Sequence, residues 1–396
     1  MSRSLGVVAV GLVGCLAAGA AHAEEEPTFR ERPVSAWVAV LTGDADVKHR
    51  QGALIALERI GPLKSAKTLP AVVAALTSKD QDEAVRAAAA GALGRMYDRV
   101  KEENQTIRWD DARDGLAAAV QADKSPAVRE AAATALGRME ADAAKVVPEL
   151  KGALKDPQSA VRSAAAEALR RIAVDKEAAK DVADALPELE RLVKDKSADH
   201  LGRAAAASAI GQVGAPEAVA AVGTLADAAA DDKAPADVRK AAAEALGRLG
   251  EDAGAAAGRL ASALSAADAP PEVRRAAAEA LDRFGPAAKP ALAALKKAVG
   301  DDDKFIRVVS MHALGRLGPE LGGEVNGVVA VLLPRIDDDV VEVRVAAIQA
   351  VGALGKDALG PDLKAVTARL AQAAGDSRPE VRGAATAALA RLKSNP

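Results

Sequence analysis

Aromatic residues are scarce in this chain of 396 residues, which has three Phe, two Trp and one Tyr. Stacking on nucleic-acid bases needs such side chains. The 53 basic and 56 acidic residues also give a net charge of −3 instead of a basic footprint. We therefore expect no nucleic-acid binding. Half of the residues are nevertheless hydrophobic, and most of these are Ala, Leu and Val. Because Ala is the strongest helix former, the composition predicts an all-α fold.

Metal-ligating side chains are also few, with one cysteine and four histidines. A metal site needs ligands that converge within a few ångströms. His49, His200 and His312 are far apart in the sequence, so we expect no metal site. No serine lies in a nucleophile motif and no glycine-rich loop follows a strand. The sequence predicts no cofactor and no catalytic residue.

Residues 1–23 have the features of an export signal. Arg3 precedes an apolar run, and Ala21-His22-Ala23 forms an A-x-A cleavage site before three glutamates. Two other interpretations stay open: Leu12-Val13-Gly14-Cys15 fits the lipoprotein pattern, in which Cys15 is lipidated, or the segment remains as an uncleaved anchor. Each interpretation predicts an exported chain, in the periplasm or at the cell surface. Residues 24–33 would then be a linker.

One phrase recurs along the rest of the chain: Val-Arg-x-Ala-Ala-Ala-x-Ala-Leu-Gly-Arg-Leu. Its first Arg recurs at intervals between 33 residues (Arg129 to Arg162) and 43 residues (Arg86 to Arg129). We call these the repeat arginines: Arg50, Arg86, Arg129, Arg162, Arg203, Arg239, Arg274, Arg307, Arg344 and Arg382. An Asp lies six residues before eight of them, and we call these the turn aspartates: Asp44, Asp80, Asp123, Asp156, Asp268, Asp301, Asp338 and Asp376.

Each repeat predicts a pair of helices. The apolar residues between Val161 and Ile172 fall at i, i+3, i+4, i+7, i+8 and i+11, which is one face of a helix. Asp156-Pro157 before them is typical of a turn and a helix start. A repeating pattern of this length predicts an α-solenoid. We expect about ten helix pairs over residues 34–396, forming one elongated, monomeric domain.

This arrangement resembles the HEAT repeat family, whose repeats carry an Asp in the turn and an Arg in the second helix at this spacing. The match is closest to the Ala-rich subtype found in phycobilin-lyase-like proteins. The resemblance implies a right-handed superhelix whose second helices line the concave surface. It also implies a non-enzymatic scaffold for a protein or peptide partner. The alternative is a lyase-like or other enzymatic HEAT protein.

The recurrence of the repeat arginines and turn aspartates favours a structural role. We expect a ladder in which each guanidinium binds carboxylates or turn carbonyls between repeats. Glycines inside the second helices, at positions 94, 137, 247 and 315, each destabilise a helix by about 1 kcal/mol relative to Ala. Their recurrence predicts that neighbouring helices approach closely there.

A second row of arginines lies nine residues after the repeat arginines. Its members are Arg59, Arg95, Arg138, Arg171, Arg248, Arg283, Arg316 and Arg391. Glu167, Glu244 and Glu279 precede three of them by four residues, a spacing that favours ion pairs along one helix. The row is then a solvated face, or alternatively a basic stripe for an acidic partner. Arg95 and Arg138 lack such a glutamate, so we expect their charges to be less neutralised.

The longest interval between repeats holds residues 97–111, which we expect to be an extended helix and a loop. Tyr97 and Trp109 bracket it, beside Arg95 and Arg138. An amphipathic aromatic residue near arginine is typical of a binding hot spot. These four residues are the candidate partner-binding site, although Tyr97 and Trp109 could instead only pack the insertion. Trp37, in the first expected helix, should cover the exposed end of the array.

Overall fold

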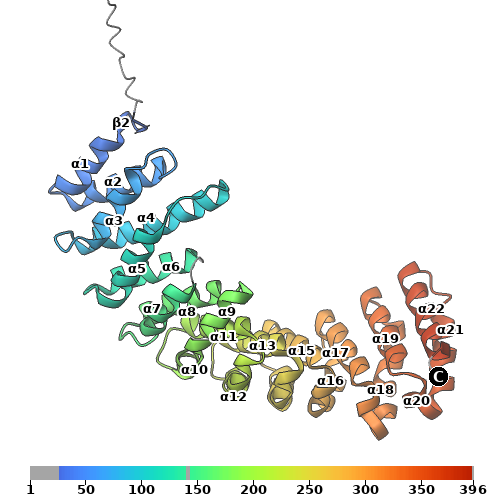
Figure 1. The fold of residues 1–396 in the computed structure, drawn as a ribbon. Coiled ribbons are helices and arrows are strands. Elements are labelled where there is room, and N and C mark those ends of the chain that lie inside the picture. Colours follow the sequence, from blue (N-terminus) through green and yellow to red (C-terminus); the bar gives the residue numbers. More distant parts are fainter. Residues whose placement is uncertain (1–25, 140–142, 395–396) are drawn as a thin grey trace, which may run out of the picture.

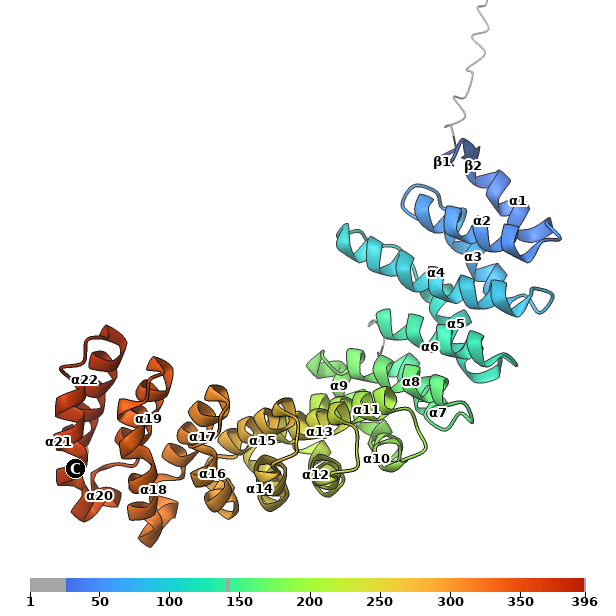
Figure 2. The same ribbon diagram turned by 180° about the vertical axis from the view of Figure 1, so that it is seen from behind.

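The computed structural model describes residues 26–139 and 143–394. Helix pairs stack side by side along an arc, with the N-terminal pair at one end and the C-terminal pair at the other (Figures 1 and 2). The ten expected pairs are all present, so the predicted all-α solenoid is confirmed. The export signal, its cleavage site and Cys15 lie outside the described residues. No helix in the described ranges is both long and apolar enough to span a membrane.

The second helix of each pair lies on the inner side of the arc (Figure 1). These helices are α2 (Val47–Ile60), α4 (Glu83–Glu102), α6 (Pro126–Arg138), α8 (Ser159–Ile172), α11 (His200–Val213), α13 (Ala236–Leu249), α15 (Pro271–Phe284), α17 (Lys304–Leu317), α19 (Val341–Ala353) and α22 (Pro379–Ser394). The predicted apolar face of α8 is buried, including Val161, Leu169 and Ile172. We call the exposed side of these ten helices the inner surface.

The first helices form the outer side of the arc. They are α1 (Val34–Gly43), α3 (Thr68–Thr77), α5 (Asp110–Ala122), α7 (Ala143–Ala153), α9 with α10 (Lys176–Val182, Leu186–Lys194), α12 (Val222–Ala230), α14 (Ala257–Ser265), α16 (Leu292–Ala298), α18 (Val325–Leu332) and α20 with α21 (Lys356–Leu359, Leu363–Ala373). From the fifth repeat onward, short 3-10 helices adjoin the first helices: η1 (Ala183–Ala185), η2 (Glu217–Ala221), η3 (Gly250–Ala256), η4 (Gly285–Ala291), η5 (Gly318–Glu324), η6 (Leu333–Asp337) and η7 (Gly360–Asp362). Several of them begin at a glycine with positive φ, such as Gly250 at 61°, which also caps the end of the preceding helix α13.

Consecutive second helices touch through a row of glycines eight residues after the repeat arginines. A Cβ at Gly137 would lie 2.6 Å from the Cα of Ala168, and one at Gly211 would lie 2.6 Å from the Cα of Ala245. Gly94, Gly247, Gly315 and Gly352 make the same kind of contact with an alanine of the next repeat. The expected close approach is confirmed at these six positions, because a Cβ there would crowd the neighbouring helix. We call these positions the glycine row.

The N-terminal end of the array is covered by a hairpin, which lies within the residues 24–33 that the sequence predicted as a linker. Strands β1 (Thr28–Phe29) and β2 (Arg32–Pro33) pair in antiparallel fashion. The indole Nε1 of Trp37 donates to the carbonyl of Phe29 at 3.1 Å, and the two rings lie 6.5 Å apart. Trp37 is half-buried and packs against the core. Phe29 and Trp37 thus shield the first pair, as an open end of a solenoid requires.

Helix α4 is the longest of the second helices within the described residues and extends beyond α6. Its last two turns and the following loop form the long interval that the sequence predicted as an extended helix and a loop. The loop returns to α5 at Asp110. The insertion therefore sits at the inner end of the second repeat.

Candidate functional site

The repeat arginines and turn aspartates form an inter-repeat ladder at the edge of the array where the first helix turns into the second. Arg129 donates through Nε and Nη2 to the carboxylate of Asp156 in the next repeat, at 2.6 and 3.0 Å. Its Nη1 donates to the carbonyl of Asp123 in its own turn at 2.9 Å. Each rung therefore holds one turn in shape and ties it to the following turn.

The same geometry recurs along the chain with two grades of contact. Arg86 with Asp123 and Arg274 with Asp301 make two hydrogen bonds each, at 2.8 to 3.3 Å. Longer contacts of 3.5 to 3.6 Å join Arg162 to Asp195, Arg307 to Asp338 and Arg344 to Asp376. Arg382, in the last repeat, donates only to carbonyls of its own turn.

Several members of the expected ladder have other partners. Arg50 donates to the Gln81 side chain at 2.9 Å instead of to Asp80. Arg203 and Arg239 donate to the carbonyls of Val193 and Ala229. The turn that follows Arg203 carries Lys233 in place of the turn aspartate, whereas the turn that follows Arg239 does carry Asp268. Asp44 has no preceding repeat and accepts from His49. Within the described ranges, neither Asp80 nor Asp268 accepts a bond from a repeat arginine.

The rungs change the acidity of the aspartates that they hold. Burial alone would raise the pKa of the Asp123 carboxyl, but hydrogen bonds from Arg86 and from the N–H of Ser125 outweigh it and lower the pKa. The pKa of Asp156 is lowered in the same way by Arg129 and the N–H of Gln158. These carboxylates are ionised parts of the scaffold, with their oxygens already occupied.

The second arginine row faces the inner surface, where the charges differ from the expected ones. Arg95 donates through Nε and Nη2 to Glu58 of the preceding repeat, at 2.9 and 2.8 Å. Arg138 pairs with Asp98, also from the preceding repeat. The expectation that Arg95 and Arg138 are the less neutralised members is therefore wrong, because the acidic partner comes from the neighbouring helix.

Three arginines of the second row are exposed without an ion pair among the described residues: Arg59 in the first repeat, Arg248 in the sixth and Arg283 in the seventh. Glu244, expected to pair with Arg248, lies 3.6 Å from Lys240 instead. Arg171 does pair with Glu167, as expected. Arg248 and Arg283 thus present unpaired guanidinium groups from adjacent helices.

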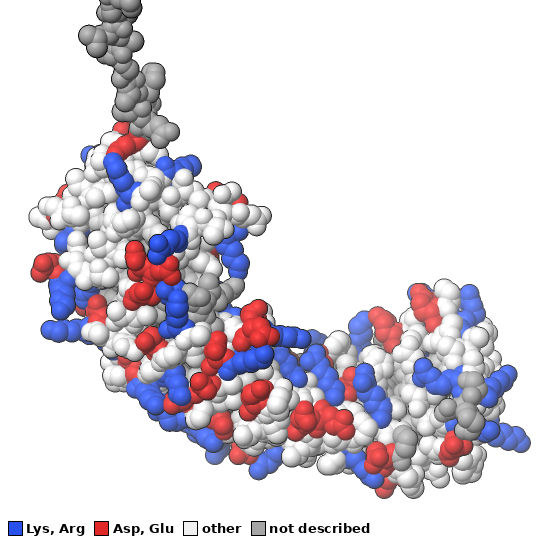
Figure 3. Space-filling view, in the orientation of Figure 1, with Lys and Arg blue, Asp and Glu red and all other residues white. Residues whose placement is uncertain are grey.

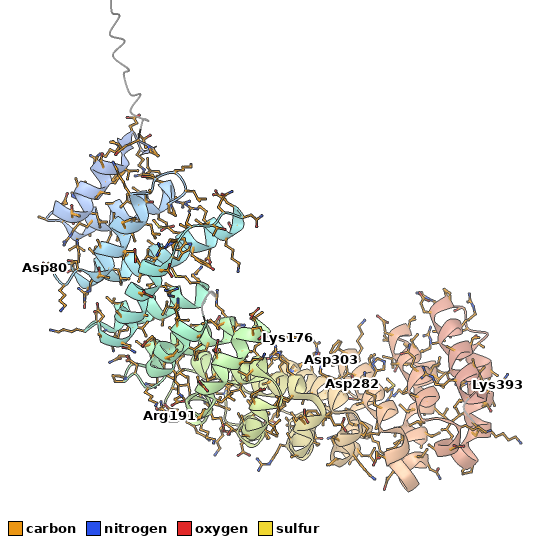
Figure 4. All side chains as sticks on the ribbon, in the orientation of Figure 1. Asp80, Lys176, Arg191, Asp282, Asp303 and Lys393 are labelled. Carbon is orange, nitrogen blue, oxygen red and sulfur yellow. The ribbon has the colours of Figure 1, made fainter. Side chains whose placement is uncertain are left out.

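Charged residues replace glycine at three positions of the glycine row, which the repeat pattern did not predict. They are Glu58, Arg170 and Asp282, each eight residues after a repeat arginine. Asp282 is on α15 (labelled in Figure 4), and its Oδ1 lies 3.0 Å from Nε of Arg316 without an aligned donor. Burial raises the pKa of Asp282, although Arg316 and His312 oppose the shift. The signal that could have revealed these residues was the interrupted glycine register.

The four candidate partner-binding residues form two separate places. Tyr97 and Trp109 meet edge to face with ring centroids 5.3 Å apart. They line a hollow of about 430 Å³ with Ile107 and Met139. Arg95 and Arg138 line another hollow of about 300 Å³, between α4 and α6. The expected single cluster is therefore divided by the body of α4.

A further groove lies on the inner surface between α17, α19 and α22. Two adjoining hollows, of about 630 and 570 Å³, share His312 and Gln349. The larger one is lined mainly by glycine and alanine, because Ala353 stands where most repeats have an arginine of the second row. Its charged lining residues are Arg316 and Arg391, and none is acidic. The repeat pattern did not predict this groove.

Charged side chains of both signs are mixed over the surface (Figure 3). Within residues 26–139 and 143–394, no three His, Cys, Asp or Glu side chains are grouped to hold a metal ion. The arrangement can bind through ion pairs and through amide hydrogen bonds.

Known proteins were compared with this chain by sequence and by structure. Comparison with curated proteins finds no match. Among solved structures, an engineered protein is similar at a TM-score of 0.65 and 23% identity, covering 92% of this chain and 99% of its own. Importin beta (0.56, 15%) and Kap121p (0.51, 14%) each match 91% of this chain, which spans about half of their length (51% and 45%).

These likenesses show a shared solenoid fold. The model of HEAT repeats matches residues 34–107, 113–201 and 258–352, which is more than half of the sequence. The matched segments include seven of the repeat arginines: Arg50, Arg86, Arg129, Arg162, Arg274, Arg307 and Arg344. The chain belongs to the HEAT repeat family.

Proposed function

We propose that this chain is an exported, non-enzymatic scaffold that binds a protein or peptide partner along its inner surface. A HEAT solenoid is suited to protein interaction because stacked repeats create one extended surface. Fold alone does not define a role, so the residues of that surface carry the proposal.

The supporting observation is the contrast between the ladder and the second arginine row. Side chains of the ladder are largely buried, and their guanidinium groups are occupied by turns. On the inner surface, Arg248 and Arg283 contribute nothing to the ladder and remain exposed without an ion pair. Charges that a fold does not use are available for a partner.

Export rests on the first 23 residues, with cleavage after Ala23 as the proposed route and lipidation of Cys15 as the alternative. We further propose that the mature chain is a monomer in the periplasm or at the cell surface. The enzymatic alternative gains no specific support. Among the acid–base groups on the second helices, His200 already pairs with Asp237 of the next repeat, and Asp282 already pairs with Arg316.

The test is affinity capture from an extract of the native host, with the purified chain as bait. The double variant Arg248→Glu/Arg283→Glu changes the inner surface. A matched variant, Lys289→Glu/Lys364→Glu, reverses two exposed and unpaired charges on the outer side. We expect a specific partner to be retained by the outer variant and lost by the inner one. Equal loss from both variants, or no saturable partner for the wild type, would contradict the proposal.

A further inference from the structure

Three consecutive repeats present an arginine of the second row at the same register: Arg248 on α13, Arg283 on α15 and Arg316 on α17. Arg248 and Arg283 are exposed and unpaired among the described residues. Arg316 uses Nε toward Asp282, and its side chain is 61% exposed. Since a guanidinium carries five N–H donors, its two Nη groups remain free to bind a second anion. The three side chains form one cationic row.

The spacing of this row follows from helix packing. A Cβ at Gly247 would lie 3.1 Å from the Cα of Ala280, so α13 and α15 are in close contact. The side chain of Arg283 runs back over Gly247, with its Cδ 3.6 Å from that Cβ position. Axes of packed helices are about 8–10 Å apart. From this axis spacing we expect the guanidinium groups to repeat about once every 9 Å.

Only some backbone conformations match this repeat. A polyproline II helix has three residues per turn and rises about 3.1 Å per residue, so every third side chain points the same way at intervals of about 9 Å. A β-strand repeats its face at about 6.6 Å, which does not match. An α-helix brings every seventh residue back at about 10 Å, but it docks through an apolar face. The surface here carries Lys240, Glu244 and Glu279.

The end of the row adds a place for the main chain of a ligand. Beyond Arg316, Ala353 interrupts the row and the groove between α17, α19 and α22 opens. Gln349 lies in this groove, and its carboxamide can donate to a carbonyl and accept from an N–H. A polyproline II segment has no internal hydrogen bonds, so its free backbone groups fit such a partner.

We propose that the inner surface of α13, α15 and α17 binds an extended acidic peptide in the polyproline II conformation, with a carboxylate at every third position. This inference rests on the proposed scaffold function and names its ligand class. Charge complementarity selects the ligand, because Arg248, Arg283 and the Nη groups of Arg316 are available. Glu244 is occupied by Lys240. Glu279 lies one turn before Arg283 and has no ion pair among the described residues, so its charge repels the carboxylates of the ligand.

The experiment is a fluorescence-anisotropy titration of the full chain with a labelled peptide of five Glu-Pro-Pro repeats. We expect saturable binding that weakens as salt is added. The double variant Arg248→Ala/Arg283→Ala should weaken binding at least about tenfold, since each exposed ion pair contributes a few-fold. Arg59→Ala is the matched control, because Arg59 is an exposed, unpaired member of the same row at the far end. It should change affinity less than about twofold.

Two further measurements test whether the charge and the spacing of the carboxylates determine binding. Glu279→Gln should tighten binding about two- to threefold, because it removes an opposing charge. A peptide of five Glu-Pro repeats has the same number of carboxylates at the wrong spacing and should bind at least about fivefold more weakly.

Four results would overturn the inference: equal affinity for the two peptides, an equal loss from Arg59→Ala, tighter binding of heparin or DNA, or no peptide binding. None of these results would decide the proposed scaffold function, which is tested separately by affinity capture with the inner and outer variants.

Discussion

The guanidinium of Arg86 holds the carboxylate of Asp123, 37 residues later, through two parallel hydrogen bonds of 2.8 Å. Both side chains are largely buried, at 15% and 11% exposed. Nη1 of Arg86 also donates to the carbonyl of Gln81 at 2.6 Å, so this one side chain contacts two turns. Stability of the array should therefore depend on these pairs more than on exposed charges.

Replacing Arg86 by alanine should lower the free energy of unfolding by about 2–3 kcal/mol, because the buried carboxylate of Asp123 loses both donors. Helical content at low temperature should stay nearly unchanged. The control is Arg382→Ala, since Arg382 is exposed and donates only to its own turn. It should lose less than about 1 kcal/mol. Urea unfolding followed by circular dichroism gives both values, and equal losses would argue against the ladder.

The same substitution, glycine to alanine, should have opposite effects inside and outside the glycine row. Gly137→Ala places a Cβ 2.6 Å from the Cα of Ala168 and should force α6 and α8 apart, costing about 1–3 kcal/mol. Gly152→Ala in α7 meets nothing within 4 Å and should stabilise by about 0.5–1 kcal/mol. Thermal unfolding of both variants measures the difference. A stabilised Gly137→Ala protein would show that the helices do not meet there.

Acid should weaken the rungs at Asp123 and Asp156. Their folded-state pKa values lie below the ordinary 3.8. A lowered pKa contributes stability that is complete above the unfolded value and is lost as pH falls through the folded value. We therefore expect Asp123→Asn to be clearly less stable than wild type at pH 7, and the gap to narrow below about pH 3 to 4.

Asp80→Asn is the control for the acid experiment, because no repeat arginine donates to Asp80 in the described structure. Its stability should follow that of the wild type throughout the pH range. Urea midpoints at several pH values give the comparison. A gap for Asp123→Asn that is independent of pH would contradict the role of its charge.

Loss of the N-terminal cover should act locally. Trp37→Ala removes the hydrogen bond to Phe29 and a half-buried ring, so we expect about 1–3 kcal/mol lower stability of the first pair. Hydrogen exchange should speed up in α1 and α2 while α19 stays unchanged, since each repeat contacts mainly its neighbours. Uniform acceleration along the chain would show instead that the array unfolds as one unit.

Processing of the export signal has a direct readout. We expect a mature N-terminus at Glu24 in protein isolated from the native host, because Ala21-His22-Ala23 forms the cleavage site. A lipidated N-terminal Cys15 is the alternative outcome. Mass spectrometry of the intact chain separates them, and a retained Met1 would refute both.

Local periodicity predicted the helix pairs because each repeat buries apolar residues at the same positions. Glycines also recur just after second helices, at positions 61, 214, 250, 285, 318 and 355, and all six have positive φ. Both results depend on residues near each other in the sequence. The interval after Arg95 was likewise predicted as a longer helix because its length exceeded the repeat.

Inner-surface charges were predicted less well, since their partners come from other repeats. Glu58 lies 37 residues before Arg95, and Asp98 lies 40 residues before Arg138. Counting four residues along one helix could not find them. The same rule paired Glu244 with Arg248, although Lys240 competes for Glu244 from the other side. To find these acidic partners, one must compare positions relative to the repeat arginine between neighbouring helices.

The direction of the ladder gives the array a mechanical polarity. Each rung runs from a guanidinium to the turn of the following repeat, and Arg382 has no such successor. Tension applied at the C-terminal end would load the rung between Arg344 and Asp376, whose contact of 3.5 Å is longer than the interior pair of Arg86 and Asp123. Under tension the last repeat should therefore unfold first, while the second to fourth repeats, which have the shorter rungs, should stay folded.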